Sequence, residues 1–177
     1  MAAKQENRNT AIAFTTTLMA VLTALTSLYM GKFSSQAILI QGDANDQWAY
    51  YQAKSIKYDT YTLQKNVLEL DLLSKRNSMS GPAAEKLSQT IAGYGMDIQK
   101  YQKQKEDIKS KAEGLEQKKA LAQRKGGNFS YALIFLQVAI MLSSISVITK
   151  KSLLWVLGLM AALGGAAFFA NGFYLWF

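Results

Sequence analysis

The chain has 177 residues and a net charge of +8, and half of its residues are hydrophobic, although its mean hydropathy is +0.00. This average conceals a very apolar part and a very polar part that cancel each other. The sequence contains neither Cys nor His, which excludes disulfides, His-ligated metals, and catalysis by a His base or a Cys nucleophile. We therefore expect a protein without enzymatic activity and without a cofactor.

Three apolar segments, residues 11–31, 129–149 and 153–177, contain no Asp, Glu, Lys, Arg or His. Each has about 20 residues, the length that an α-helix needs to cross roughly 30 Å of hydrocarbon. We predict a membrane-spanning helix over each segment, and a polar N-terminus over residues 1–10. The first apolar run also fits a signal peptide, but no small-x-small cleavage motif follows it, so we expect an uncleaved anchor.

Five threonines give the first span a polar face: Thr15, Thr16, Thr17, Thr23 and Thr26. Their hydroxyls would bond carbonyls of their own helix or reach a neighbouring helix. Because the spans carry no charged side chain, a proton relay, a voltage sensor or a charge-coupled transporter is not expected from this chain alone. A pore would have to be lined by Thr, Ser, Gln137 and backbone.

The polar segment between the first two spans, residues 32–128, has the pattern of a helical hairpin. Its first arm carries a weak heptad with two core positions, namely Ala49, Ile56, Leu63 and Leu70 at one and Ala53, Thr60 and Val67 at the other. Its second arm carries a regular stripe at alternating steps of four and three, namely Leu87, Ile91, Tyr94, Ile98, Tyr101, Lys105, Ile108, Ala112, Leu115, Lys119 and Ala122. Together they predict a long antiparallel coiled coil.

Two local signals set the limits of the second arm. We predict a turn near residues 77–82, because Pro82 suits the first turn of a helix. At the other end, Gly126, Gly127 and Asn128 predict a break or a bend before the second span.

The segment DQWAYYQAKSIK of the first arm combines rigid aromatic, amide and Lys side chains within about three helical turns. This composition is typical of an interaction surface. The candidate surface residues are Trp48, Tyr50, Tyr51, Gln52, Lys54, Lys57 and Tyr58. The competing interpretation is that Trp48 and Tyr51 pack on the opposing arm or on a symmetry-related subunit.

The third span carries a small residue at every fourth position: Gly158, Ala162, Ala166 and Ala170. Such a stripe lets another helix approach closely. We expect the partner to be a span of the same chain, and a dimerisation face is the alternative.

The segments DQWAYYQAKSIK, KYQKQKEDIKSKAEGLE, FLQVAI and KKSLLWVLGL, in this order along the chain, resemble a bacterial membrane family known only as a domain of unknown function. The resemblance covers nearly the whole chain. It implies a bacterial inner-membrane protein, and it implies no activity, substrate or catalytic residue.

Charge predicts the partners and the sidedness. Residues 31–128 hold 16 Lys and Arg against 11 Asp and Glu, and basic residues next to a bilayer favour anionic lipids. Acids alternate with bases along the arms, so nucleic-acid binding is not expected.

The short Lys150-Lys151 loop predicts that this loop and the N-terminus are cytoplasmic and that the hairpin is periplasmic. Lys118, Lys119, Arg124 and Lys125 favour the opposite orientation.

These observations lead to an all-α membrane protein with three transmembrane helices. We expect it to be a non-enzymatic, homo-oligomeric scaffold or spacer that associates through Trp48, Tyr51, Tyr58 and the edges of the heptads. An unidentified protein partner would also fit such a scaffold. The alternative function is an oligomeric pore or gate lined by the Thr-rich first helix.

Overall fold

The computed structural model describes residues 2–75 and 79–176, and all of its regular structure is helical within these ranges. The helices are α1 (Ala2–Ser74), α2 (Gly81–Thr149) and α3 (Ser152–Tyr174). Each contains a stretch that is long and apolar enough to cross a membrane. The prediction of an all-helical chain with three possible spans is therefore confirmed.

The predicted turn near residues 77–82 is described only in part, because residues 77 and 78 lie outside the described residues. The carbonyl of Ser80 accepts hydrogen bonds from the backbone N–H groups of Ala83 and Ala84. Helix α2 begins at Gly81, so Pro82 lies in its first turn. This position suits Pro because the N–H group that Pro lacks would have no partner within the helix there.

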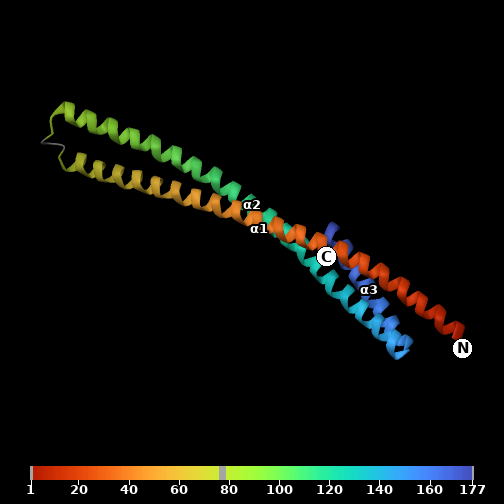
Figure 1. The fold of residues 1–177 in the computed structure, drawn as a ribbon. Helices are drawn as coiled ribbons and strands as arrows, with labels where there is room; N and C mark the ends of the chain where they lie inside the picture. Colours follow the sequence, from red (N-terminus) through yellow and green to blue (C-terminus); the bar gives the residue numbers. More distant parts are fainter. Residues whose placement is uncertain (1, 76–78, 177) are drawn as a thin grey trace. The chain divides into compact units, whose positions relative to one another are not determined.

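The chain divides into two compact units. We call Met1–Leu39 together with Lys118–Phe177 the apolar unit, and Ile40–Gln117 the polar unit. The apolar unit contains the start of α1, the end of α2 and the whole of α3, and the polar unit contains the rest of α1 and α2 (Figure 1).

In the apolar unit, α2 is the central helix. Its fully buried residues recur at steps of three and four: Phe129, Ala132, Leu136, Ala139, Ser143 and Ser146. The ring of Phe129 stacks on Tyr29 and Phe33 of α1, at centroid distances of 5.5 and 5.6 Å. It also meets Phe169 and Phe173 of α3 edge-on. One side chain therefore joins all three helices.

Glycines of α3 allow it to approach α2 closely. A Cβ added at Gly158 would lie 3.0 Å from the carbonyl oxygen of Ala139 and 2.9 Å from Ser143 Oγ. At Gly165 an added Cβ would lie 2.8 Å from Leu136 Cγ, and at Gly172 it would lie 2.7 Å from the Phe129 ring. These three glycines are seven residues apart, so they lie on one face of the helix.

The predicted break at Gly126–Asn128 is absent, since α2 continues to Thr149. Gly126 is buried, and a Cβ there would meet Ser34 Oγ of α1 at 3.6 Å. The side chains of Asn128 and Ser130 donate to the carbonyls of Arg124 and Gly126, four residues earlier. Packing against α1 therefore outweighs the low helix propensity of two adjacent glycines, which costs about 1 kcal/mol each.

In the polar unit, the predicted stripe of α2 faces α1. Its positions from Leu87 to Leu115 are half-buried, apart from Ile108 and Ala112, which are buried. Tyr61 of α1 contacts both Tyr94 and Tyr101 of α2, at centroid distances of 5.5 and 5.4 Å.

The heptad predicted for α1 is wrong, because its residues point away from α2. Ile56, Leu63, Val67 and Leu70 are 62–67% exposed, and Ala49, Ala53 and Thr60 are exposed as well. The half-buried positions of this helix include Tyr51, Tyr58 and Tyr61. On α1, tyrosine rings with adjacent lysines therefore contribute to this contact, and the predicted heptad does not.

Candidate interaction surfaces

The seven candidate surface residues, six within DQWAYYQAKSIK and Tyr58 directly after it, lie on two different faces of α1. Trp48, Tyr51 and Tyr58 are half-buried. The rings of Trp48 and Tyr51 meet edge-on at 5.7 Å. Lys105 Nζ of α2 lies 4.4 Å from the centroid of Tyr58 and 5.6 Å from that of Tyr51. These contacts are cation–π interactions within one chain, and they favour the interpretation that the aromatic residues pack on the opposing arm.

The other four residues are more peripheral. Tyr50, Gln52 and Lys57 are exposed, and Lys54 is half-buried. Lys54 Nζ lies 5.0 Å from the centroid of Tyr50 and 5.5 Å from that of Tyr101. Lys57 Nζ lies 5.9 Å from the centroid of Tyr101. Because the candidate residues divide between the seam and solvent, they do not form one continuous surface.

The tyrosine seam also changes the acidity of one phenol. Charge on Tyr101 and then on Asp97 raises the pKa of Tyr61 above its ordinary value of 10.0, and desolvation adds to the effect. All three residues belong to the polar unit. The neutral phenol of Tyr61 is thus favoured in the folded protein.

A different surface on α1 has the geometry of a docking face. We call Ile56, Leu63, Val67 and Leu70 the aliphatic stripe, and all four belong to the polar unit. Their spacing is that of a coiled-coil seam. The sequence contains this signal, but it contains a second heptad of Tyr residues in the same helix. The sequence of α1 alone does not show which of these two faces packs on α2, because that depends on the side chains that α2 presents.

The small-residue stripe of α3 is only partly buried. Gly158 is buried against α2, Ala162 and Ala170 are half-buried, and Ala166 is exposed. Ala162 and Ala166 line an apolar groove of about 420 Å³ together with Leu18, Met19 and Leu22 of α1, among others. The closest helix contacts of α3 instead lie at Gly158, Gly165 and Gly172. The seven-residue spacing of these glycines is the sequence signal for this contact, and the predicted four-residue stripe includes only Gly158 of the three.

The threonines of the first span direct most of their hydroxyls to their own helix. Thr17, Thr23 and Thr26 each donate to the carbonyl four residues earlier. Thr15 donates to the carbonyls of Ala11 and Ile12, and its oxygen also accepts from Trp155 Nε1 of α3 at 3.2 Å. Thr15 therefore also links α1 to α3.

A buried amide pair adds a second polar link within the apolar unit. Asn171 Nδ2 of α3 donates to Asn128 Oδ1 of α2 at 3.0 Å. Asn171 is fully buried and Asn128 is 8% exposed. In apolar surroundings such a bond sets which positions of two helices can face each other.

Net charge is confined to one unit. The apolar unit has nine Lys and Arg residues against one acid, Glu6, whereas the polar unit has eleven of each sign. The nine form two groups: Lys4, Arg8, Lys150 and Lys151 on one side of the apolar segments, and Lys32, Lys118, Lys119, Arg124 and Lys125 on the other. Both groups flank uncharged stretches of the length that a bilayer requires.

A family model described as "Domain of unknown function (DUF4337)" matches residues 8–175. No curated protein and no solved structure matches the chain.

Proposed function

We propose that this chain, which belongs to the DUF4337 family of unknown function, is a non-enzymatic membrane scaffold that assembles from copies of itself. In this proposal the three apolar segments cross the bilayer and the two arms of the polar unit pair as an antiparallel coiled coil. The aliphatic stripe of α1 joins the copies. The location is the inner membrane of a bacterium.

The observation that carries this proposal is the exposure of the aliphatic stripe. Ile56, Leu63, Val67 and Leu70 repeat at heptad spacing yet are 62–67% exposed in a single copy. Soluble surfaces rarely leave such contiguous apolar residues in water. A second copy of the same helix buries them most simply, because a heptad face is complementary to itself.

Membrane anchoring restricts how two copies meet. Copies inserted with the same topology have their α1 helices parallel, so each stripe residue faces its equivalent. The two core positions are then occupied by Thr60 and Val67 at one and by Ile56, Leu63 and Leu70 at the other. A β-branched residue at the first position with Leu at the second favours two strands. Thr60 fits this core because its hydroxyl already bonds the Ile56 carbonyl.

The charges beside the stripe are compatible with a parallel pair. In a parallel pair, the residue at heptad position g of one helix faces the residue at position e of the other helix, which is five residues later in the sequence. The facing residues would be Gln52 with Lys57, Asp59 with Gln64, and Asn66 with Asp71. Every pair contains a neutral amide, so no like charges are brought together.

The contacts between α1 and α2 in the polar unit support the antiparallel pairing of the two arms. Tyr51 and Tyr58 of α1 contact Lys105 of α2, whereas the later Tyr61 contacts the earlier Tyr94 and Tyr101. Contacts whose order runs in opposite directions along the two helices support antiparallel packing. The two arms together would hold a partner or a second membrane at a distance from the bilayer.

The pore interpretation has less support. The hydroxyls of Thr17, Thr23 and Thr26 are used by carbonyls of their own helix, and such hydroxyls contribute little to a water path.

Self-association is tested by native mass spectrometry of the full chain in detergent. The variant Ile56→Gln/Leu63→Gln/Leu70→Gln should weaken the dimer by about tenfold or more, because each change leaves an apolar contact unmade. Met96, which is 68% exposed on α2, provides the matched control Met96→Gln, and this variant should leave the dimer intact. A monomeric wild-type chain, or a dimer that survives the triple substitution, would contradict the proposal.

A further inference from the structure

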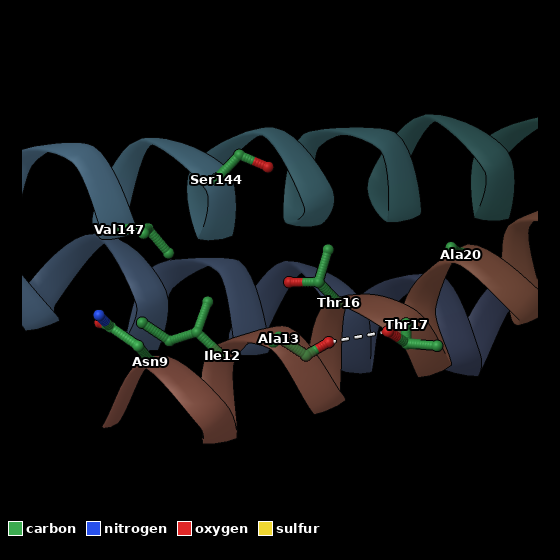
Figure 2. A pocket seen from close by; sticks show the side chains of 8 residues that line it. All are labelled: Asn9, Ile12, Ala13, Thr16, Thr17, Ala20, Ser144 and Val147. Atoms are coloured by element: carbon green, nitrogen blue, oxygen red, sulfur yellow. Dashed lines mark hydrogen bonds between the residues drawn. The ribbon is translucent and has the colours of Figure 1, made fainter. Parts of the chain in front are cut away.

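The apolar unit has a groove between the start of α1 and the end of α2. It has a volume of about 430 Å³ and is lined by Asn9, Ile12, Ala13, Thr16, Thr17, Ala20, Ser144 and Val147. Figure 2 shows these side chains on the two helices, with the Thr17 hydroxyl bonded to the Ala13 carbonyl. The volume is within the range of about 300–1,000 Å³ that ligand sites commonly have.

Three basic residues adjoin the segments that line this groove: Arg8, Lys150 and Lys151. Arg8, immediately before Asn9, donates from its NH1 nitrogen to the carbonyl of Lys150 at 2.9 Å. This bond joins the start of α1 to the loop that carries Lys150 and Lys151. The only acid of the apolar unit is Glu6, and the structure forms no ion pair between it and these three residues.

The loop between α2 and α3, which carries Lys150 and Lys151, has a defined backbone conformation. Lys150 adopts a left-handed conformation with φ 58°, and Ser146 Oγ donates to the Lys151 carbonyl at 2.8 Å. Lys151 is the N-cap of α3, and its side chain makes no capping hydrogen bond. The first turn of α3 contains no acid, so no carboxylate of that turn neutralises the lysines.

Two buried polar atoms at this end have no hydrogen-bond partner in the protein. They are Arg8 Nε, a donor, and Asn9 Oδ1, an acceptor. Buried polar atoms normally find partners. Asn9 also lines the groove, so a ligand bound there would lie close to the unpaired atom of Asn9.

We propose that this groove binds one anionic phospholipid, with the phosphate beside Arg8, Lys150 and Lys151 and an acyl chain along Ile12, Ala13, Ala20 and Val147. The charge of the site selects an anion, and the apolar lining selects a lipid over free phosphate. A headgroup with hydroxyls, such as glycerol, would donate to Asn9. The proposal does not depend on self-association, because the site belongs to a single copy.

The test is native mass spectrometry of the full chain titrated with phosphatidylglycerol or phosphatidylcholine. The wild-type chain should retain one phosphatidylglycerol in preference to phosphatidylcholine. The variant Arg8→Gln/Lys150→Gln/Lys151→Gln should bind phosphatidylglycerol more weakly by about tenfold or more. The matched control Lys32→Gln/Arg124→Gln/Lys125→Gln removes the same charge from the other basic group and should keep the lipid.

A second variant guards against a folding defect in the first. Ala13→Leu/Ala20→Leu fills the groove without changing any charge, and it should also lose the lipid while keeping wild-type helicity by circular dichroism. Equal retention by all variants would overturn the proposal. Equal loss in both charge variants, with retention in the groove variant, would also overturn it, because it would indicate non-specific attraction of anions.

Discussion

At the residue scale, single atoms limit the distance between α2 and α3. Gly158 is the strictest case, because the nearest atoms to an added Cβ include the backbone oxygen of Ala139 at 3.0 Å. A backbone carbonyl cannot rotate away as a side chain can, so any side chain at residue 158 pushes the helices apart. Small residues matter in membranes for this reason, since close contact replaces the hydrophobic effect as a driving force there.

We expect Gly158→Ala to destabilise the chain by about 1–3 kcal/mol through overpacking. Gly127 is the control, because nothing lies within 4 Å of a Cβ added there, and Gly127→Ala should be neutral or slightly stabilising. Thermal unfolding in detergent distinguishes the two variants. Equal unfolding temperatures would show that the helices can separate at little cost.

Ala166 gives a second contrast in the same helix. It is exposed and lines the groove between α1 and α3, so Ala166→Leu adds volume where space exists. We expect this variant to unfold within about 0.5 kcal/mol of wild type, as surface substitutions commonly do. A loss as large as that of Gly158→Ala would mean that the helices also pack tightly at Ala166.

Tyr61 makes the polar unit sensitive to alkali. Its pKa in the folded state is raised above 10.0, chiefly by Tyr101 and then by Asp97. Stability from the neutral phenol is therefore complete below pH 10 and is lost as the pH rises through the higher folded-state pKa. We expect Tyr61→Phe, which cannot ionise, to keep its helicity to a higher pH than wild type in a circular-dichroism titration. Identical titrations would show that other groups control alkaline unfolding.

At the scale of the element, α1 presents two chemically different faces in the polar unit. The face with Tyr51, Tyr58 and Tyr61 packs on α2, and the face with Ile56, Leu63 and Leu70 is exposed. Because the chain has no Cys, single cysteines report on the second face without interference. We expect oxidised Leu63→Cys to form a disulfide-linked dimer in membranes, since equivalent core positions face each other in a parallel pair.

Met96→Cys is the control for this cross-linking, because Met96 is equally exposed but lies on α2. It should remain monomeric on denaturing gels under the same oxidation. Cross-linking at residue 96 and not at residue 63 would place the contact between copies on α2 instead.

The elements differ in how far the sequence predicted them. Spans without charge are recognisable because hydrocarbon tolerates few alternatives, and the stripe from Leu87 to Leu115 has only one apolar face to bury. Helix α1 is ambiguous in sequence because it carries two heptads, and its packing face includes Tyr51, Tyr58 and Tyr61 instead of the predicted aliphatic heptad. The groove beside Arg8 could not be predicted, because it depends on contacts between residues about 140 positions apart in sequence.

At the scale of the whole molecule, membrane topology decides on which side of the bilayer the polar unit finds its partners. The short loop Lys150-Lys151 favours the cytoplasm, and with three spans the polar unit is then on the other side of the membrane. We expect protease added to intact spheroplasts to digest the polar unit while a tag in the Lys150-Lys151 loop stays protected. Lysed spheroplasts should lose both. Protection of the polar unit until lysis would reverse the orientation.

The division of charge between the two units separates their responses to ionic strength. The polar unit carries eleven charges of each sign and the apolar unit carries the entire excess of +8. Added electrolyte shortens the Debye length from about 30 Å at 0.01 M to about 3 Å at 1 M. Attraction between the apolar unit and anionic lipid headgroups should therefore fade across this range, whereas contact between electroneutral aliphatic faces should persist. A salt gradient would release the lipid while the copies stay together.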